Sequence, residues 1–210
     1  MVAFMAERSD AAGCGAHLVD SRGRPDLGCA DRPGLGREIM AAAGLDKIFK
    51  KNRFLNPYFR NYLSLKTPQE VPVISGADLM VRKDLFKKLG GFDEKFFFYY
   101  EDTDLCLRLN AAGLKLFYLP EVTMVHVRGG TIGDFSRQKF LEWRKSRLYF
   151  YKKNFRSRQF LMVKYLILFT LALRFILFPV FWLGQLVGLK KKLEKYSLYF
   201  AAWKMIINYE

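Results

Sequence analysis

Residues 96–109 read FFFYYEDTDLCLRL, and this stretch decides the fold. Five aromatic residues precede three carboxylates within four positions, Glu101, Asp102 and Asp104. A leucine-rich pattern then continues to residue 112, which predicts a helix with Asp102 or the following residue as its N-cap. Carboxylates in a first helical turn are stabilised by the helix dipole, so the three acids suit this position.

The three carboxylates admit two interpretations. In the simpler one, Asp102 caps the helix, Glu101 is solvated and Asp104 pairs with Arg108 four residues later. In the other, mutual repulsion between the acids requires a nearby cation, which is a metal, a basic residue or a substrate. The aromatic run then walls a partly apolar pocket. A carboxylate at its mouth is a candidate general base, because desolvation raises its pKa.

The sequence on both sides of this helix alternates between strand and helix patterns. Strands are predicted at 71–75, 79–82, 114–119 and 122–127, with Pro120 separating the last two. Asp84 is the predicted N-cap of a short helix that Gly90 and Gly91 end. The stretch CGAHLVDSRGRPDLGC (14–29) contains a turn signal between two extended segments. This order of elements predicts an α/β layered body.

Length and composition favour one domain with an appendage. The chain has 210 residues, 51% of them hydrophobic, which is enough for one core. The three cysteines, Cys14, Cys29 and Cys106, form no CxxC pair, so neither a disulfide framework nor a zinc knuckle is predicted. Charged residues follow the first five positions at once, so we expect no secretory signal and a cytosolic body.

The net charge of +15 is concentrated in one part of the chain. Residues 135–195 contain 15 Lys and Arg against two acids, Glu142 and Glu194. The same part is also the most apolar, and a basic run with long apolar neighbours favours an anionic membrane surface over a nucleic acid. The sequence contains no motif typical of DNA or RNA binding. We therefore predict a membrane surface as a partner and no nucleic acid.

The C-terminal third leaves three membrane arrangements open. Residues 139–158 predict a basic helix, and between 165 and 184 the only charge is Arg174, a length that could span a bilayer. Thr170, Arg174 and Gln185 nevertheless fall on one stripe of a helix, and Pro179 would divide the segment. We favour an in-plane or re-entrant helix pair, with a true span and a buried helical hairpin as the alternatives.

The run from SGADLMVRKDLF to MVHVRGGT (75–131) closely resembles the second half of the catalytic domain of glycosyltransferase family 2, in particular its bacterial rhamnosyltransferase-like members. The segment HLVDSRGRPDLGC (17–29) is similar to the strand, turn and strand that follow the donor site in that family. The resemblance covers roughly residues 1–154. It implies a GT-A fold, which is a Rossmann-like α/β layer that binds a nucleotide-diphospho-sugar, followed by an acceptor half.

The resemblance also implies a chemistry. Family members transfer the sugar with inversion, and the Asp of an ED motif deprotonates the acceptor hydroxyl, so Asp102 is the implied base and Glu101 its partner. A divalent cation, Mg²⁺ or Mn²⁺, is implied at the leaving diphosphate, with His126 as one ligand. Substrate contacts are implied at Gly76, Ala77, Asp78, Tyr100 and Arg128. Three alternatives stay open: a backbone hydrogen bond for His126, a bend in a strand at Gly76 and simple exposure to solvent for Arg128.

The family's first half, which holds the nucleotide and ends in a metal-binding DxD, has no counterpart in residues 1–72. We therefore predict an α/β fold that is a partial GT-A domain lacking its N-terminal nucleotide-binding half, followed by C-terminal amphipathic or apolar helices. The expected domains are 1–154, the acceptor-side part of the transferase, and 155–210, a membrane-associated helical tail.

The expected function is inverting transfer of a sugar, with rhamnose as the candidate, during synthesis of a cell-surface polysaccharide. The donor is a nucleotide-diphospho-sugar, and the acceptor is a saccharide or lipid-linked saccharide at the cytoplasmic face of the bacterial inner membrane. This chain alone is expected to be incomplete. The alternative function is a catalytically inactive or split membrane-bound partner of a complete glycosyltransferase, and either a homo- or a hetero-oligomer is compatible with it.

Overall fold

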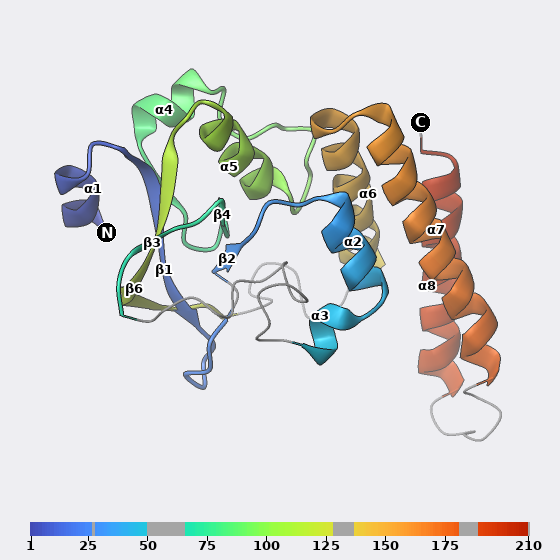
Figure 1. The fold of residues 1–210 in the computed structure, drawn as a ribbon. Helices are drawn as coiled ribbons and strands as arrows, with labels where there is room; N and C mark the ends of the chain where they lie inside the picture. Colours follow the sequence, from blue (N-terminus) through green and yellow to red (C-terminus); the bar gives the residue numbers. More distant parts are fainter. Residues whose placement is uncertain (27, 50–65, 128–136, 181–188, 210) are drawn as a thin grey trace. The chain divides into compact units, whose positions relative to one another are not determined.

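The computed structural model describes residues 1–26, 28–49, 66–127, 137–180 and 189–209. The chain falls into two compact units, Met1–Asp134 and Phe135–Glu210 (Figure 1). The division lies at residue 134, whereas the sequence analysis placed the start of the helical tail at residue 155. The predicted basic helix therefore belongs to the second unit.

Two long strands form the centre of the sheet in the first unit. Strands β1 (Ala11–Val19) and β6 (Lys115–Val125) run parallel and pair along most of their length. Strand β5 (Met80–Val81) pairs antiparallel with β1, and β3 (Gln69–Glu70) pairs antiparallel with β6. The order in the sheet is thus β3-β6-β1-β5. The prediction of a mixed α/β body is confirmed.

Strand β6 continues through Pro120, so the prediction of two separate strands around this proline is wrong. Between Ala16 and His17 of β1, the paired residue on β6 changes from Leu119 to Thr123. Pro120 therefore lies in an irregular part of the ladder, where the missing N–H of proline interrupts no regular hydrogen bond.

Helices and a short ribbon complete the first unit. The described helices are α1 (Val2–Glu7), α2 (Leu35–Ala42), α3 (Leu45–Ile48), α4 (Lys83–Lys88) and α5 (Glu101–Ala111). The ribbon pairs β2 (Cys29–Ala30) with β4 (Val73–Ile74). The predicted N-caps Asp84 and Asp102 are wrong by two positions, because each lies at the second residue of its helix.

The core of the first unit lies on both faces of β6. Leu116 and Tyr118 are buried in one cluster with Leu105, Cys106 and Leu109 of α5. The alternate residues of β6, Phe117 and Leu119, are buried in a second cluster with Met5 of α1. Because successive side chains of a strand point to opposite faces, β6 joins α5 and α1 across the sheet (Figure 1). This packing fixes the start of α5 relative to the strands.

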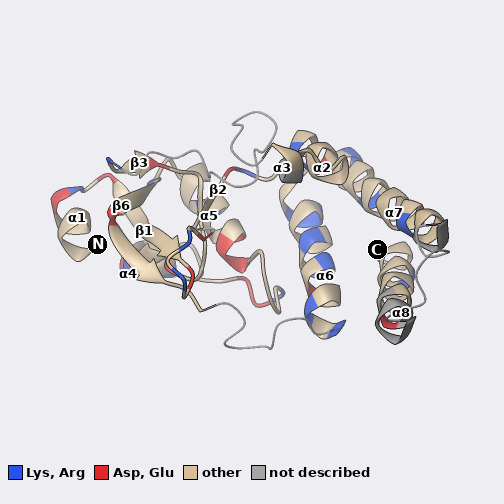
Figure 2. Cartoon of the chain, turned by 90° about the horizontal axis from the view of Figure 1, so that it is seen from below, with Lys and Arg blue, Asp and Glu red and all other residues tan. Residues whose placement is uncertain are grey.

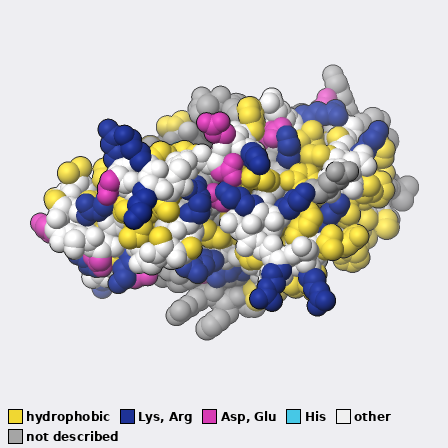
Figure 3. Space-filling view, turned by 90° about the horizontal axis from the view of Figure 1, so that it is seen from above, with side chains coloured by type: hydrophobic (Ala, Val, Ile, Leu, Met, Phe, Trp, Pro, Cys, Tyr) yellow, Lys and Arg dark blue, Asp and Glu magenta, His cyan; other side chains and the backbone are white. Residues whose placement is uncertain are grey.

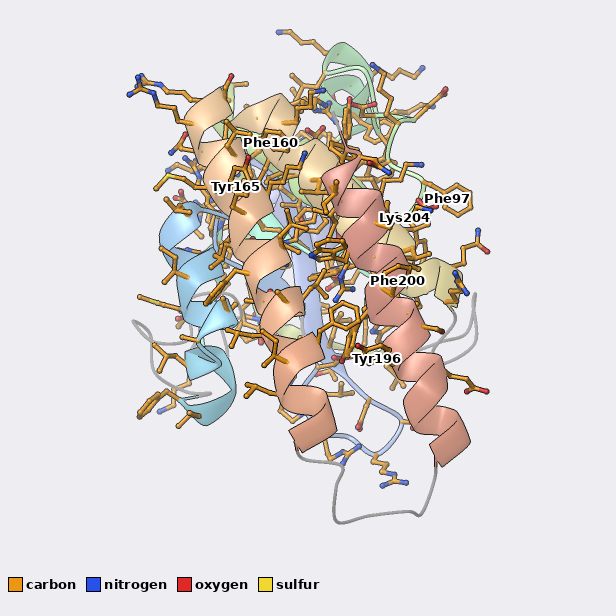
Figure 4. All side chains as sticks on the ribbon, turned by 90° about the vertical axis from the view of Figure 1, so that its right-hand side faces the viewer. Phe97, Phe160, Tyr165, Tyr196, Phe200 and Lys204 are labelled. Carbon is orange, nitrogen blue, oxygen red and sulfur yellow. The ribbon has the colours of Figure 1, made fainter. Side chains whose placement is uncertain are left out.

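The described part of the second unit consists of three helices: α6 (Arg137–Asn154), α7 (Ser157–Val180) and α8 (Leu189–Ile207). Each contacts the other two. The buried side chains include Leu148, Phe150 and Tyr151 of α6, Val163, Ile167 and Leu171 of α7, and Leu198, Tyr199, Ala202 and Ile206 of α8. The helices lie side by side in Figure 4. Their mutual contacts show that each helix has a protein-facing side.

The outer sides of α7 and α8 are rich in exposed apolar side chains. They include Leu161, Met162, Tyr165, Phe169, Leu173, Ile176 and Leu177 on α7 and Tyr196, Phe200, Trp203 and Ile207 on α8. Hydrophobic side chains also gather over the helices of this unit in Figure 3. Within the described part of the chain, one helical segment, Ser157–Leu177, has the length and the apolar composition to cross a bilayer.

Candidate active site

The carboxylate of Asp102 is held by backbone and side-chain donors in the first turn of α5. Its Oδ2 accepts a hydrogen bond from the N–H of Gly76 at 2.8 Å. Its Oδ1 accepts from the N–H of Thr103 at 2.6 Å and from the Thr103 hydroxyl at 3.1 Å. Two sequence-predicted residues, Gly76 and Asp102, are thus brought together across 26 positions. Three donors fix the orientation of this half-buried carboxylate.

Gly76 approaches the Asp102 side chain closely. A Cβ atom at residue 76 would lie 3.4 Å from the Cβ of Asp102 and 3.5 Å from its Oδ2. The next residue, Ala77, donates its N–H to the Ser75 hydroxyl at 3.3 Å, so this segment forms a tight turn rather than a continued strand. The absence of a side chain at Gly76 leaves its N–H free to reach the carboxylate.

The two residues that precede α5 have an unusual backbone conformation. Tyr99 and Tyr100 have φ angles of 67° and 70°, in the left-handed region that residues with a Cβ seldom adopt. Tyr100 is buried and is the N-cap of α5, without a capping side-chain hydrogen bond. Two such residues in a row cost energy and persist only where the surrounding packing requires them. They bring the acidic residues into the first helical turn, where Figure 2 shows them in red.

The two neighbouring carboxylates differ in their surroundings. Burial raises the pKa of Glu101, and the charge of Asp102 raises it further. Its Oε2 atom is buried and has no hydrogen-bond partner among the described residues, so the simpler interpretation, a solvated Glu101, is wrong. Asp104 is fully buried and pairs with Arg108 at 2.8 Å, as predicted from the spacing. Glu101 is thus available to a ligand, whereas Asp104 is structural.

Asp78 lies in the same turn as Gly76 and is 8% exposed. Its Oδ2 accepts a hydrogen bond from the N–H of Ala16 on β1 at 2.6 Å, while its Oδ1 is buried with no partner among the described residues. Burial raises the pKa of Asp78 to about 7, against the opposing effects of the Ala16 hydrogen bond and of His126. Asp78 therefore anchors the turn to the central sheet, and His126 lies close enough to act on it.

His126 follows the end of β6 and is paired with an acid that the sequence analysis missed. Its Nδ1 lies 2.9 Å from Oδ2 of Asp26, whose side chain is 2% exposed. Its backbone N–H donates to the carbonyl oxygen of Val19 at 2.8 Å, which ties it to the end of β1. Because Asp26 occupies Nδ1, the nitrogen left for a ligand is Nε2.

The described residues do not form a complete site for the divalent cation that the resemblance implies. Among the residues that the structure describes, no group of three or more His, Cys, Asp and Glu side chains is placed to hold a metal ion. His126 offers one nitrogen, and a metal needs several ligands. Arg128, one of the predicted substrate contacts, lies outside the described residues. The metal role of His126 and the substrate role of Arg128 stay predictions.

Comparison with known proteins decides the family. The family model described as "Glycosyl transferase family group 2" matches residues 48–208, which is most of the chain. The chain belongs to this family. The resemblance found in the sequence is therefore confirmed, and the mixed α/β unit with its parallel strands β1 and β6 fits a GT-A-like domain.

Curated members of the family are similar over parts of this glycosyltransferase-family chain. An N-acetylglucosaminyl-diphospho-decaprenol L-rhamnosyltransferase of Mycobacterium tuberculosis (strain H37Rv) is 37% identical over 103 residues, 48% of this chain and 32% of that protein. Rhamnosyltransferase WbbL of Escherichia coli K12 is 44% identical over 52 residues, 25% of this chain and 20% of WbbL. The dTDP-rhamnosyl transferase RfbF of Shigella flexneri is 36% identical over 64 residues, 30% of this chain and 22% of RfbF. The chain thus matches a third or less of the length of these relatives.

Proposed function

We propose that this chain carries the acceptor-side part of an inverting sugar transferase, with rhamnose from a dTDP-linked donor as the first substrate to test. The family membership supports sugar transfer in general. The names of three relatives from different bacteria support rhamnose, and one of those names contains a diphospho-decaprenol, which is a lipid carrier. The acceptor in this proposal is accordingly a saccharide or a lipid-linked saccharide.

Asp102 is the proposed general base. In the transfer step the acceptor oxygen forms a bond to the anomeric carbon while the bond from that carbon to the nucleoside diphosphate breaks and the diphosphate takes the electron pair. The acceptor hydroxyl proton passes to the Asp102 carboxylate. The observation that carries this proposal is the set of three hydrogen bonds from Gly76 and Thr103, because a carboxylate held in one orientation needs no reorganisation before it accepts the proton.

The neighbouring residues have supporting roles in the proposal. Glu101, with its unpartnered and buried Oε2, faces a ligand rather than bulk water. Gly76, which donates to Asp102, and Ala77, Asp78 and Tyr100 are the proposed substrate contacts, and Asp78 holds the turn that contains Gly76 to β1. A bound Mg²⁺ or Mn²⁺ would stabilise the negative charge of the leaving diphosphate, and Nε2 of His126 is the proposed ligand atom.

The second unit is the proposed membrane attachment, at the cytoplasmic face of the bacterial inner membrane. Exposed apolar side chains on α7 and α8 alternate with buried ones, so each helix has a side that the other described helices of this unit leave exposed. Lys and Arg residues lie along α6 and α7 of the same unit (Figure 2). Apolar contact with acyl chains and attraction of the cations to anionic lipid would together hold the unit at the bilayer.

The substitution Asp102→Asn tests the proposed base. Bacterial membranes containing the full chain are supplied with labelled dTDP-rhamnose and a lipid-linked saccharide acceptor, and transferred label is measured. We expect Asp102→Asn to lower the transfer rate about 10²–10⁴-fold, because an amide cannot take the proton. The one amide oxygen can still accept from Gly76 or from Thr103, although not from both, since the NH2 group only donates. The circular dichroism spectrum should stay unchanged.

The matched control is Glu94→Gln, which neutralises an exposed carboxylate on the loop before α5 and should retain the wild-type rate. Equal rates for Asp102→Asn and the wild type would overturn the proposal and favour the alternative, a membrane-bound partner without catalysis of its own.

A further inference from the structure

A buried arginine in the helical unit has no acidic partner among the residues that the structure describes. Arg144 of α6 is 7% exposed, and its Nη1 donates to the carbonyl oxygen of Phe140 at 3.2 Å. Its Nε is buried and has no hydrogen-bond partner among the described residues. A buried guanidinium is normally paired with an acid, since removal of the charge from water is costly. Burial accordingly lowers the pKa of Arg144 to about 10.

A second arginine lies close to the first. Arg174 of α7 is exposed, and its positive charge is the second cause of the lowered pKa of Arg144. Two like-charged guanidinium groups that lie near each other disfavour the packing of their helices unless a negative charge compensates them. This arginine pair, which the helix packing keeps together despite the repulsion, therefore suits a negatively charged ligand.

Aromatic rings of α6 and α8 contact these two guanidinium groups. The Cζ atom of Arg144 lies 3.4 Å from the ring centroid of Phe140, and the Cζ of Arg174 lies 5.6 Å from that of Tyr199 on α8. The rings of Phe140 and Tyr199 are 5.9 Å apart between centroids, so α6 and α8 are in contact here. Helix α7 joins them through Arg174, which lies over Tyr199. Cation–π contacts of this kind orient the planar groups before a ligand arrives.

The acids of the helical unit are in the wrong places to neutralise this pair. Among its described residues they are Glu142 and Glu194. Glu142 is two positions from Arg144 on one helix, a spacing that does not share a face, and Glu194 is exposed near the start of α8. The compensating charge for the two arginines must therefore come from outside the described part of this unit.

We propose that Arg144 and Arg174 form a binding site for the diphosphate of a lipid-linked saccharide, at the junction of α6, α7 and α8. This inference rests on the proposed function and adds to it the residues that recognise the lipid carrier of the acceptor. Arginine matches phosphoryl oxygens with two parallel N–H bonds, and two guanidinium groups match the two phosphoryl groups of a diphosphate.

The surroundings of the site favour a lipid as the source of the diphosphate. Phe175, next to Arg174, stacks edge-on against Tyr196 and Phe200 of α8, at 4.7 Å and 6.4 Å between centroids. Tyr196 and Phe200 are partly or largely exposed and are labelled on α8 in Figure 4. An apolar chain attached to the diphosphate would continue onto this exposed aromatic surface, which a free nucleotide would not use.

Binding of farnesyl diphosphate to the full chain in nanodiscs of neutral phosphatidylcholine tests this site. The dissociation constant is measured by titration calorimetry for the wild type and for Arg174→Gln, which changes an exposed residue and should leave the fold intact. We expect Arg174→Gln to weaken binding about tenfold or more, because it removes a charge-assisted pair of hydrogen bonds. The matched control is Arg158→Gln, which removes an exposed charge elsewhere on α7 and should leave the affinity within about twofold of the wild type.

Three further arms identify the ligand. Farnesol lacks the diphosphate and should not bind measurably at this site, and inorganic pyrophosphate lacks the lipid and should bind more weakly than farnesyl diphosphate. Phosphatidylglycerol added to the nanodiscs should compete poorly. Equal binding of farnesol, of pyrophosphate or of phosphatidylglycerol would overturn the proposal in favour of an apolar surface, a free-diphosphate site or a general headgroup site, respectively. Equal effects of Arg174→Gln and Arg158→Gln would also overturn it.

The binding measurement is independent of catalysis. Asp102→Asn should bind farnesyl diphosphate like the wild type, since Asp102 is not among the residues proposed for this site. A chain that binds the lipid but loses no transfer in Asp102→Asn would refute the proposed base alone. A chain that transfers sugar but ignores Arg174→Gln would refute the lipid site alone.

Discussion

Arg108 of α5 and Arg144 of α6 are both arginines packed into the protein, and they differ in what surrounds the charge. Arg108 donates to the buried carboxylate of Asp104 at 2.8 Å and to the carbonyl oxygens of Leu89 and Gly91 at 2.6 Å and 2.7 Å. Arg144 donates to one carbonyl oxygen and has a buried Nε without a partner among the described residues. The first arginine completes a structural network, whereas the second has capacity left for a ligand. Burial alone therefore does not tell a structural charge from a functional one.

The largest effect on stability is expected from breaking the completed pair. Asp104→Asn leaves the Arg108 charge partly buried without its acid, which should lower the free energy of unfolding by on the order of 3 kcal/mol. Urea denaturation of the full chain in detergent, followed by circular dichroism, measures this. Asp10→Asn removes one partner of the exposed Arg8–Asp10 pair and should have little effect. Equal stabilities of the two variants would show that the Asp104–Arg108 pair is not structural.

Asp78 is an intermediate case, because one of its carboxylate oxygens has a partner and the other has none among the described residues. Its pKa is raised from the ordinary value of 3.8 to about 7 by burial, so the folded chain binds this proton more tightly than the unfolded chain. The free energy of unfolding should therefore fall as the pH rises from about 4 to about 7, by at most roughly 1.4 kcal/mol per pH unit.

Asp78→Asn checks this pH dependence, because the amide can still accept from Ala16 but does not titrate. Its free energy of unfolding should be flatter than that of the wild type over the same pH range. Asp84→Asn, at an exposed position on α4, is the control that should keep the wild-type slope. An unchanged slope in Asp78→Asn would exclude this carboxyl as the source of the pH dependence.

The smallest effect on stability is expected from the unpaired arginine. Arg144→Met keeps a long side chain and removes a buried charge that has no acidic partner in the described part of the chain, so the free energy of unfolding should stay equal or rise by about 1 kcal/mol. The same variant should lose affinity for farnesyl diphosphate. A loss of stability as large as that of Asp104→Asn would show that Arg144 has a hidden structural partner, and the contrast with Arg108 would disappear.

The sequence predicts local pairs better than distant ones. The Asp104–Arg108 pair follows from four-residue helical spacing, which fixes which side chains are neighbours. The hydrogen bond between Gly76 and Asp102 and the pair between His126 and Asp26 join residues 26 and 100 positions apart. Their approach depends on the register of β1 and β6, which composition and periodicity do not set.

Two features of the backbone were also beyond sequence reasoning. Pro120 predicts a break, yet β6 continues, because an irregularity in the ladder coincides with the proline. Tyr99 and Tyr100 adopt positive φ angles that favour glycine, and nothing in the letters FFFYYED signals this strain. In the helical unit, the stripe that contains Arg174 was predicted, but the burial of Arg144 depends on the contacts among α6, α7 and α8 and was not.

The most direct test measures both sites in both variants. Transfer of labelled rhamnose and binding of farnesyl diphosphate are determined for Asp102→Asn and Arg174→Gln in the same membrane preparation. The prediction is that Asp102→Asn loses transfer about 10²–10⁴-fold and keeps its affinity for farnesyl diphosphate, while Arg174→Gln loses affinity and shows a raised KM for the lipid-linked acceptor. Variants that lost both properties together, or neither, would contradict the assignment of proton transfer to Asp102 and of lipid recognition to the arginine pair.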